Sequence, residues 1–169
     1  WSFSRDVNLE FEFVGINFYD GQAFMTSKEL GIKSALELDG SSICVISGSI
    51  NEVNTSNFFK SYNMDYKMVL LDSYKESEQY YIEGNCDVFT GDLTTLAVSR
   101  VKMPDSNNHI ILPEIISKEP LGPVVRHGDN EWADIVRWTL NAMIAAEEFG
   151  INSTNVDNFL DSENYEILR

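Results

Sequence analysis

Residues 44–52 read CVISGSINE, an apolar run that stops at Ser47 and Gly48 and passes at once into a helix start. Ser49 and Glu52 stand three positions apart, which is the spacing of a capping box at a helix N-terminus. The first N–H groups of a helix have no intrahelical acceptor, and together with the helix dipole they attract an anion. This stretch therefore predicts a buried strand, a turn and a helix whose start offers donors to a negatively charged group.

Residues 86–92 read CDVFTGD and form a second apolar run that ends in small polar residues. This β-rich run brings Asp92 to the carboxyl end of a strand, where open α/β sheets bind their ligands. Donors for an anion in the first stretch and a carboxylate for a cation in the second suit a zwitterion. We expect the two stretches to form two halves of one binding cleft.

The elements around these stretches alternate between strand and helix. Patterning predicts strands at 9–19, 23–26, 43–47, 66–71, 86–90 and 110–116, and helices at 34–38, 50–62, 73–82, 92–101, 129–150 and from 153 or 154. The order strand, helix, strand, helix, strand over residues 43–90 predicts a doubly wound α/β sheet with parallel strands. The strand before the turn pair Asp20-Gly21 and the helices after Pro120 look like parts of a second body, joined to the first by two crossings.

The long helix that begins after Asp129 is predicted to be amphipathic. Six apolar residues fall on one face: Trp132, Ile135, Val136, Leu140, Met143 and Ile144. We interpret the aromatic stripe of Trp132 and Trp138 as packing rather than as part of a site.

Composition limits the partners of the chain. Its 169 residues carry 12 Lys and Arg against 27 Asp and Glu, a net charge of -15, which repels phosphate backbones and anionic lipid surfaces. Nucleic acid is therefore not expected as a partner. Direct membrane insertion is not expected either, because no apolar run reaches the roughly 20 residues of a membrane span. The start at Trp1, without an initiator Met or a signal peptide, indicates a chain that is processed or cut from a longer one.

The two cysteines, Cys44 and Cys86, stand at the heads of the two stretches. They are either a disulfide or two buried thiols, and their spacing alone leaves both open. If the two strands are parallel neighbours that end level, the two cysteines also start level and come within bridging reach. A disulfide would indicate an oxidising compartment.

Enzymatic readings lack the residues that their chemistry requires. The sequence contains neither a Gly-x-Ser-x-Gly elbow nor a phosphate-binding loop with its lysine. His109 and His127 have no metal-ligand spacing to each other or to a cysteine. We therefore expect no catalytic residues, no metal and no cofactor.

Several of these stretches, taken jointly, are specific enough to indicate a protein family. Over essentially its whole length the chain resembles the periplasmic solute-binding proteins of polar amino-acid ABC transporters, and most closely the general L-amino-acid-binding proteins. The resembling residues are 4–6, 13–22, 44–52, 86–92, 111–123 and 134–140. The resemblance implies a type II two-lobed clamp: one complete α/β lobe with a mostly parallel sheet flanked by helices, plus part of the other lobe.

The resemblance also implies how the chain is divided. Residues 1–21 would be the last strand of lobe 1 and the first hinge crossing, 22–117 lobe 2, and 118–169 the second crossing with the C-terminal helices of lobe 1. The chain would then be a fragment that lacks most of lobe 1. The hinge residues it implies are Tyr19, Asp20, Gly21, Gln22, Lys118 and Glu119.

The ligand site implied by the resemblance reads the backbone of an amino acid. Arg5 resembles the arginine that grips the α-carboxylate in a bidentate pair, and Asp92 resembles the acceptor of the α-ammonium. Second-lobe groups would bind the same carboxylate: Ser47, Gly48, Ser49 and the helix start at Ile50. Ile50 departs from the pattern, because similar proteins carry threonine there, but its backbone N–H is retained.

The expected function is that of an extracytoplasmic, non-catalytic component that binds L-amino acids and delivers them to permease subunits in the membrane. The expected location is the periplasm. Two alternatives remain open at this point: an amino-acid-sensing module of a signalling receptor, and a dehydratase-like enzyme on the same fold.

Overall fold

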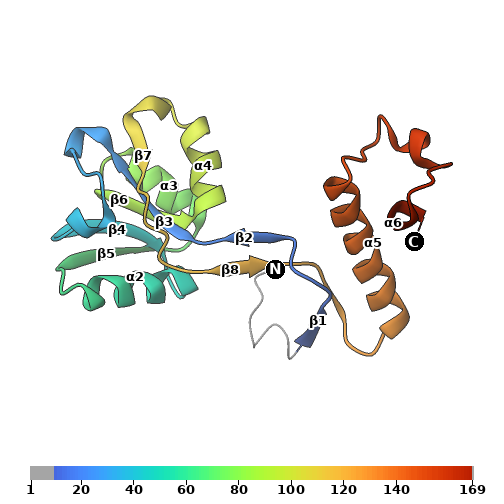
Figure 1. Ribbon diagram of the computed structural model, residues 1–169. Helices are drawn as coiled ribbons and strands as arrows, with labels where there is room; N and C mark the ends of the chain where they lie inside the picture. The colour runs from blue at the N-terminus through green and yellow to red at the C-terminus, as the bar shows by residue number, and fades with distance from the viewer. Residues whose placement is uncertain (1–9, 169) are drawn as a thin grey trace. The chain divides into compact units, whose positions relative to one another are not determined.

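The computed structural model describes residues 10–168 (Figure 1). The residues from Tyr19 to Glu119 form one compact unit, and the described residues on either side of them form a second. The assignment of these units to two lobes stays a prediction.

The first unit is built on a five-stranded sheet in the order β5-β4-β6-β3-β7. β4 pairs in parallel with β5 on one side and with β6 on the other, whereas β3 pairs antiparallel with both β6 and β7. Only β3 therefore runs against the other four strands, and the sheet is mixed. The strands are β3 (Gln22–Ser27), β4 (Ser41–Ile46), β5 (Tyr66–Leu71), β6 (Val88–Asp92) and β7 (His109–Ile111).

The parallel part of this sheet follows the predicted order, because β4, β5 and β6 are joined by helices α2 (Ile50–Ser61) and α3 (Tyr74–Ile82). α2 packs on one face of the sheet through Phe58 and Phe59. α3 and α4 (Leu93–Lys102) pack on the other face through Tyr81 and Leu96. This two-sided α/β arrangement confirms the predicted fold class (Figure 1). The remaining short turns of the unit are 3-10 helices at Lys28–Leu30, Ala35–Glu37 and Ser106–Asn108.

A disulfide joins Cys44 to Cys86, with 5.9 Å between their Cα atoms, which confirms the bridge. The level start that we expected for the two cysteines is wrong. Cys44 stands opposite Phe89 in the parallel register, and Cys86 precedes the first residue of β6, Val88. The bridge therefore ties the middle of β4 to the loop that enters β6.

The strand predicted over residues 9–19 is in fact two strands, β1 (Phe11–Phe13) and β2 (Phe18–Asp20), with Gly15 between them. A Cβ at Gly15 would lie 2.8 Å from Leu140, and one at Gly122 would lie 1.9 Å from the Gly15 carbonyl oxygen. This close backbone approach interrupts the strand. Asp20-Gly21 is likewise no turn, because β2 continues almost directly into β3.

The two crossings form a two-stranded sheet of β2 with β8 (Glu119–Leu121). In the second unit β1 pairs antiparallel with β9 (Val124–Arg126), and a small core of Val14, Val125 and Ala133 holds the long helix α5 (Asn130–Glu148). Asp129 accepts a hydrogen bond from the Trp132 N–H, as expected of a helix cap. The last described elements are a 3-10 helix at Val156–Phe159 and α6 (Tyr165–Leu168). The last helix was predicted to start at residue 153 or 154, before either of them.

The apolar face predicted for α5 is largely exposed rather than packed. Trp132 and Trp138 are 52% and 67% exposed, and Ile135, Met143 and Ile144 are exposed as well. Within the described part of the chain, Ala133 is the only fully buried residue of this helix.

Candidate functional site

The two stretches of the predicted cleft meet at one edge of the sheet. β4 and β6 are adjacent and parallel, so their carboxyl ends lie at the same edge. α2 begins just after β4 at this edge, and Asp92 is the last residue of β6. The hydrogen-bonding contact between Asn51 Nδ2 and Asp92 Oδ1, 3.5 Å long, joins the helix start to the strand end.

The start of α2 is a capping box that is shifted by one residue. The Ser49 hydroxyl accepts a hydrogen bond from the Glu52 N–H at 3.3 Å. The Glu52 carboxylate, however, accepts from the N–H of Gly48 at 2.7 Å rather than from that of Ser49, whose N–H donates to the Ile46 carbonyl. The N–H of Gly48, one of the predicted anion donors, is thus already paired with a carboxylate.

Of the other predicted donors, the N–H of Ser47 is also paired within the protein, whereas the N–H of Ile50 is not. The N–H of Ser47 donates to the Leu71 carbonyl at 2.9 Å. In the described residues, the N–H groups of Ile50 and Asn51 have no acceptor, as is normal for the first turn of a helix. An anion at this edge would therefore meet the backbone of Ile50 and Asn51 rather than that of Gly48. The side chain of Ile50 is 63% exposed and leaves this position open.

Asp92 stands at the cap position of α4 but makes no capping hydrogen bond. The cap comes instead from Asp20, whose carboxylate accepts from the N–H of Thr94 at 3.4 Å and from its hydroxyl. The N–H of Leu93 is satisfied by the Gly21 carbonyl at 2.8 Å. The Asp92 carboxylate is thereby left without a structural duty at the helix it precedes.

Electrostatics at Asp92 favour an incoming cation. Burial is the largest effect and raises the pKa of the Asp92 carboxyl above its ordinary value, the hydrogen bond from Asn51 lowers it, and the charge of Asp20 raises it again. A carboxylate that is costly to ionise where it stands gains from a positively charged partner.

Beneath this edge lies a buried polar cluster that the sequence did not indicate. Gln22 is fully buried, and its side-chain Nε2 lies 2.9 Å from the hydroxyls of Thr55 and Thr90 and 3.0 Å from the Asn51 carbonyl oxygen. In the sequence, Gln22 simply follows the pair Asp20-Gly21, which reads as a turn, and nothing there indicates a buried side chain. Only the antiparallel register, which sets Gln22 opposite Asp92, places it there.

The predicted hinge residues fall into two groups. Tyr19 and Lys118 are exposed, Glu119 begins β8, and Gly21 is packed so closely that a Cβ would lie 2.6 Å from the Ser117 carbonyl oxygen. Asp20, the last residue of β2, also caps α4, and Gln22 is fully buried at the start of β3. The hinge role of these residues stays a prediction. Arg5 lies outside the described residues.

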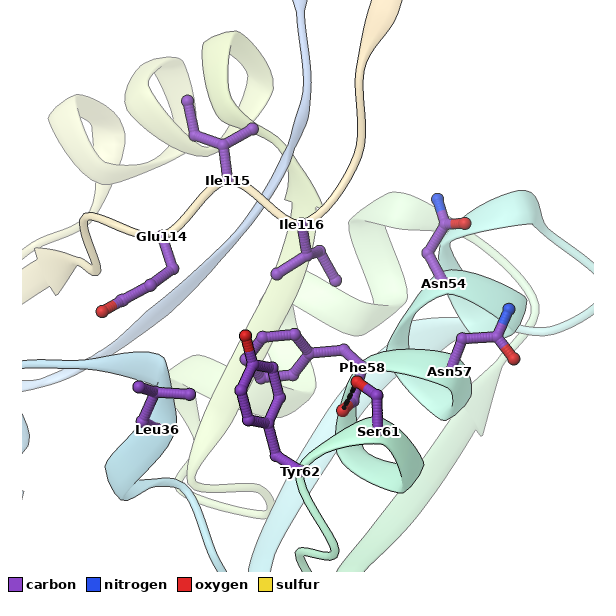
Figure 2. Close-up of a pocket in the computed structure, with 9 residues that line it drawn as sticks. All are labelled: Leu36, Asn54, Asn57, Phe58, Ser61, Tyr62, Glu114, Ile115 and Ile116. Carbon is purple, nitrogen blue, oxygen red and sulfur yellow. Dashed lines mark hydrogen bonds between the residues drawn. The ribbon is translucent and has the colours of Figure 1, made fainter.

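A separate hollow of about 670 Å³ lies along the C-terminal half of α2 (Figure 2). Phe58 and Tyr62 line it with ring centroids 5.0 Å apart, and Ile116 points toward Phe58 from the segment opposite. None of the predicted ligand residues that the structure describes lines this hollow.

His109 has a structural partner, because its Nδ1 lies 2.7 Å from the Tyr81 hydroxyl. Over residues 10–168, no group of three or more His, Cys, Asp or Glu side chains is arranged to hold a metal ion. In the same range, no helix has the length and apolar character needed to cross a membrane.

Comparison with known proteins gives a consistent set of relatives, although no protein-family model matches the chain. The chain is 52% identical to the glutamate/glutamine/aspartate/asparagine-binding protein BztA of Rhodobacter capsulatus, over 100% of this chain and 50% of that protein. It is 49% identical to the general L-amino acid-binding periplasmic protein AapJ of Rhizobium johnstonii, again over 100% of this chain and 50% of that protein.

Among solved structures, a periplasmic binding protein of an ABC transporter from Brucella ovis, with glutathione bound, superposes with a TM-score of 0.92 at 46% identity. The match covers 100% of this chain and 53% of that one. The chain thus spans about half the length of the relatives it matches.

Proposed function

Because the chain is homologous over its whole length to periplasmic amino-acid-binding proteins of ABC transporters, we propose that the whole protein binds L-amino acids for delivery to a membrane permease. The named relatives are binding proteins, and nothing in them favours the sensor module or the dehydratase-like enzyme. The protein acts in this proposal as a carrier without catalysis.

A single observation carries the proposal: Asp20 caps α4, so the Asp92 carboxylate faces the start of α2 without a capping duty. A carboxylate acceptor and first-turn N–H donors then stand at one edge of the sheet. An amino acid presents an ammonium and a carboxylate on the same carbon, and these two groups match the two halves of the edge. Such charge-assisted hydrogen bonds are stronger than those between neutral groups.

In detail, Asp92 accepts from the α-ammonium, and the backbone N–H groups of Ile50 and Asn51 donate to the α-carboxylate. Arg5 pairs with the same carboxylate in this proposal, on the strength of the resemblance alone. Because these groups read the amino-acid backbone, we propose that the protein accepts several side chains, which agrees with the broad ligand descriptions of BztA and AapJ.

The location and partners follow the same reasoning. AapJ and the binding protein from Brucella ovis are periplasmic by name, and the Cys44–Cys86 disulfide suits an oxidising compartment such as the periplasm. We propose that the protein works there with the permease subunits of an ABC transporter.

The test is titration calorimetry of the complete gene product against a panel of single L-amino acids, with Asp92→Asn as the variant. Removing one charged hydrogen-bond partner costs about 1.5–3 kcal/mol. That cost corresponds to a loss of about 10- to 150-fold in affinity.

Asp72→Asn is the matched control, because Asp72 follows β5 at the same edge, is exposed, and loses the same charge without touching the site. Failure of every amino acid to bind the wild-type protein would refute the proposed function. Unchanged affinity in Asp92→Asn would refute the role of Asp92.

A further inference from the structure

The Gln22 side-chain amide joins the two halves of the proposed site from below. On one side its Nε2 contacts the first turns of α2, at the Asn51 carbonyl oxygen and the Thr55 hydroxyl. On the other side it contacts the Thr90 hydroxyl, two residues before Asp92 in β6. One amide group thus touches the helix that offers donors and the strand that carries the acceptor.

The orientation of this amide is determined by its neighbours. The Thr55 hydroxyl donates to the Asn51 carbonyl at 2.7 Å, and the Thr90 hydroxyl donates to the Ala23 carbonyl at 2.8 Å. With their hydrogens committed, both hydroxyls can only accept from Gln22, so the NH₂ group must face them. Among the described residues, the Gln22 Oε1 is buried and has no hydrogen-bond partner. The neighbours of Gln22 thus hold its amide in one orientation, with the NH₂ group toward α2 and β6.

The start of α2 has little else to hold it against the sheet. The only buried residues of this helix are Thr55 and Phe59, and the apolar one lies near its C-terminal end. Ile50 and Val53, in the first turn, are 63% and 52% exposed. The N-terminal half of α2 is therefore held by polar contacts. Those of the Gln22 amide connect α2 to β6.

We infer that Gln22 is a positioning residue that sets the gap between the α2 start and Asp92, and so selects α-amino acids over β-amino acids. This inference rests on the proposed function, in which the helix start binds the carboxylate and Asp92 the ammonium. In an α-amino acid these two groups share one carbon, and in a β-amino acid an extra methylene separates them. A gap held at one width discriminates between the two, whereas a loosened gap accepts both.

The test compares L-glutamate with its isomer 3-aminoglutarate, which has the same atoms and charges but carries its ammonium on the carbon β to both carboxylates, so that neither carboxylate shares a carbon with it. Both are measured by calorimetry on the complete gene product. Gln22→Met keeps the length of the side chain and removes the amide. We expect it to weaken L-glutamate binding by about tenfold or more and 3-aminoglutarate binding by less than threefold, so that the preference for the α-isomer falls.

Thr26→Val is the matched control, because Thr26 is fully buried in the same strand, donates one hydrogen bond to the Asp87 carbonyl, and lies at the other end of β3. It should leave the preference unchanged. Thr90→Val supplies a second, milder variant: it removes the Thr90 hydroxyl, with its contacts to Gln22 and to the Ala23 carbonyl, but leaves the contacts of Gln22 with α2 in place. It should lower the preference by a smaller factor than Gln22→Met.

A merely structural role for Gln22 predicts equal weakening of both isomers, and that result, in either Gln22→Met or Thr90→Val, would overturn the inference. Failure of the proposed function is a distinct result, because the wild-type protein would then bind no amino acid of the panel before any variant is compared.

Discussion

Two aspartates near the start of α4 have different roles: one caps the helix, and the other is left free of that role. Asp20 and Asp92 both lie at the start of α4, and sequence position alone assigns the cap to Asp92 because it directly precedes the helix. The structure gives the cap to Asp20 instead. Burial raises the pKa of the Asp92 carboxyl, and the charge of the neighbouring Asp20 raises it further. A residue that its own helix does not need is available for a ligand.

A pH dependence of stability follows at the same scale. The pKa of Asp92 is higher in the folded protein than in the unfolded chain, so its ionisation favours unfolding, and this cost is present above the folded pKa and absent below the unfolded one. We expect Asp92→Asn to raise the free energy of unfolding at pH 7, and this gain to shrink as the pH falls through the carboxyl range.

Urea unfolding of both proteins between pH 3 and 7 measures this difference. A gain that is the same at every pH would contradict the assignment. Together with the expected loss of affinity, a stabilising Asp92→Asn would mark a residue kept for binding at the expense of stability.

At the scale of elements, the disulfide ties β4 to the loop that enters β6, and these two strands lead to the two halves of the site. Cys44 and Cys86 close a loop with a sequence separation of 42 residues, and this loop contains α2, β5 and α3. The bond therefore limits how far β4 can separate from the entry to β6 in the unfolded chain.

We expect Cys44→Ala/Cys86→Ala to lower the free energy of unfolding by up to about 4 kcal/mol, the chain-entropy figure for a loop of this length. Denaturant unfolding of the double variant against the oxidised protein measures the loss. Reduction of the wild-type protein with dithiothreitol is the parallel experiment and should give a loss of the same size. No change in either case would show that the bridge contributes nothing in solution.

At the scale of the whole molecule, the exposed apolar face of α5 is the feature that the described residues leave unexplained. Trp132, Trp138 and Met143 are each more than half exposed, and such a face on a helix is normally covered. The relatives are about twice as long as this chain. We propose that further chain in the complete gene product covers this face.

We predict that the 169-residue chain by itself associates through α5, because its apolar face gains by burial. Analytical ultracentrifugation over a concentration series should show self-association that Trp138→Ser weakens. Tyr19→Ser is the control, since Tyr19 is 73% exposed and does not belong to α5. A monomer at all concentrations would contradict the prediction.

Much of the secondary structure could be predicted from short stretches of sequence. The strands and helices between residues 41 and 102 were predicted to within a few residues, because each signal lies within a few positions of the element it controls, as with Ser49 and Ser73 at the helix starts. The candidate site was predicted in part: the α2 start and Asp92 meet at one edge as expected. The donors changed because Glu52 reaches Gly48, a detail of side-chain geometry.

By itself, the sequence determined the α/β order, the helix caps at Ser49 and Ser73, and the resemblance to amino-acid-binding proteins through its motifs, since these depend on neighbouring residues or on joint patterns. Only the tertiary structure decided that β3 runs against the other strands, that Asp20 caps a helix 74 residues away, and that Gln22 reaches partners 29 to 68 residues away. Such contacts depend on which strands become neighbours and in which register. No local pattern encodes them, because their geometry exists only once the sheet has formed.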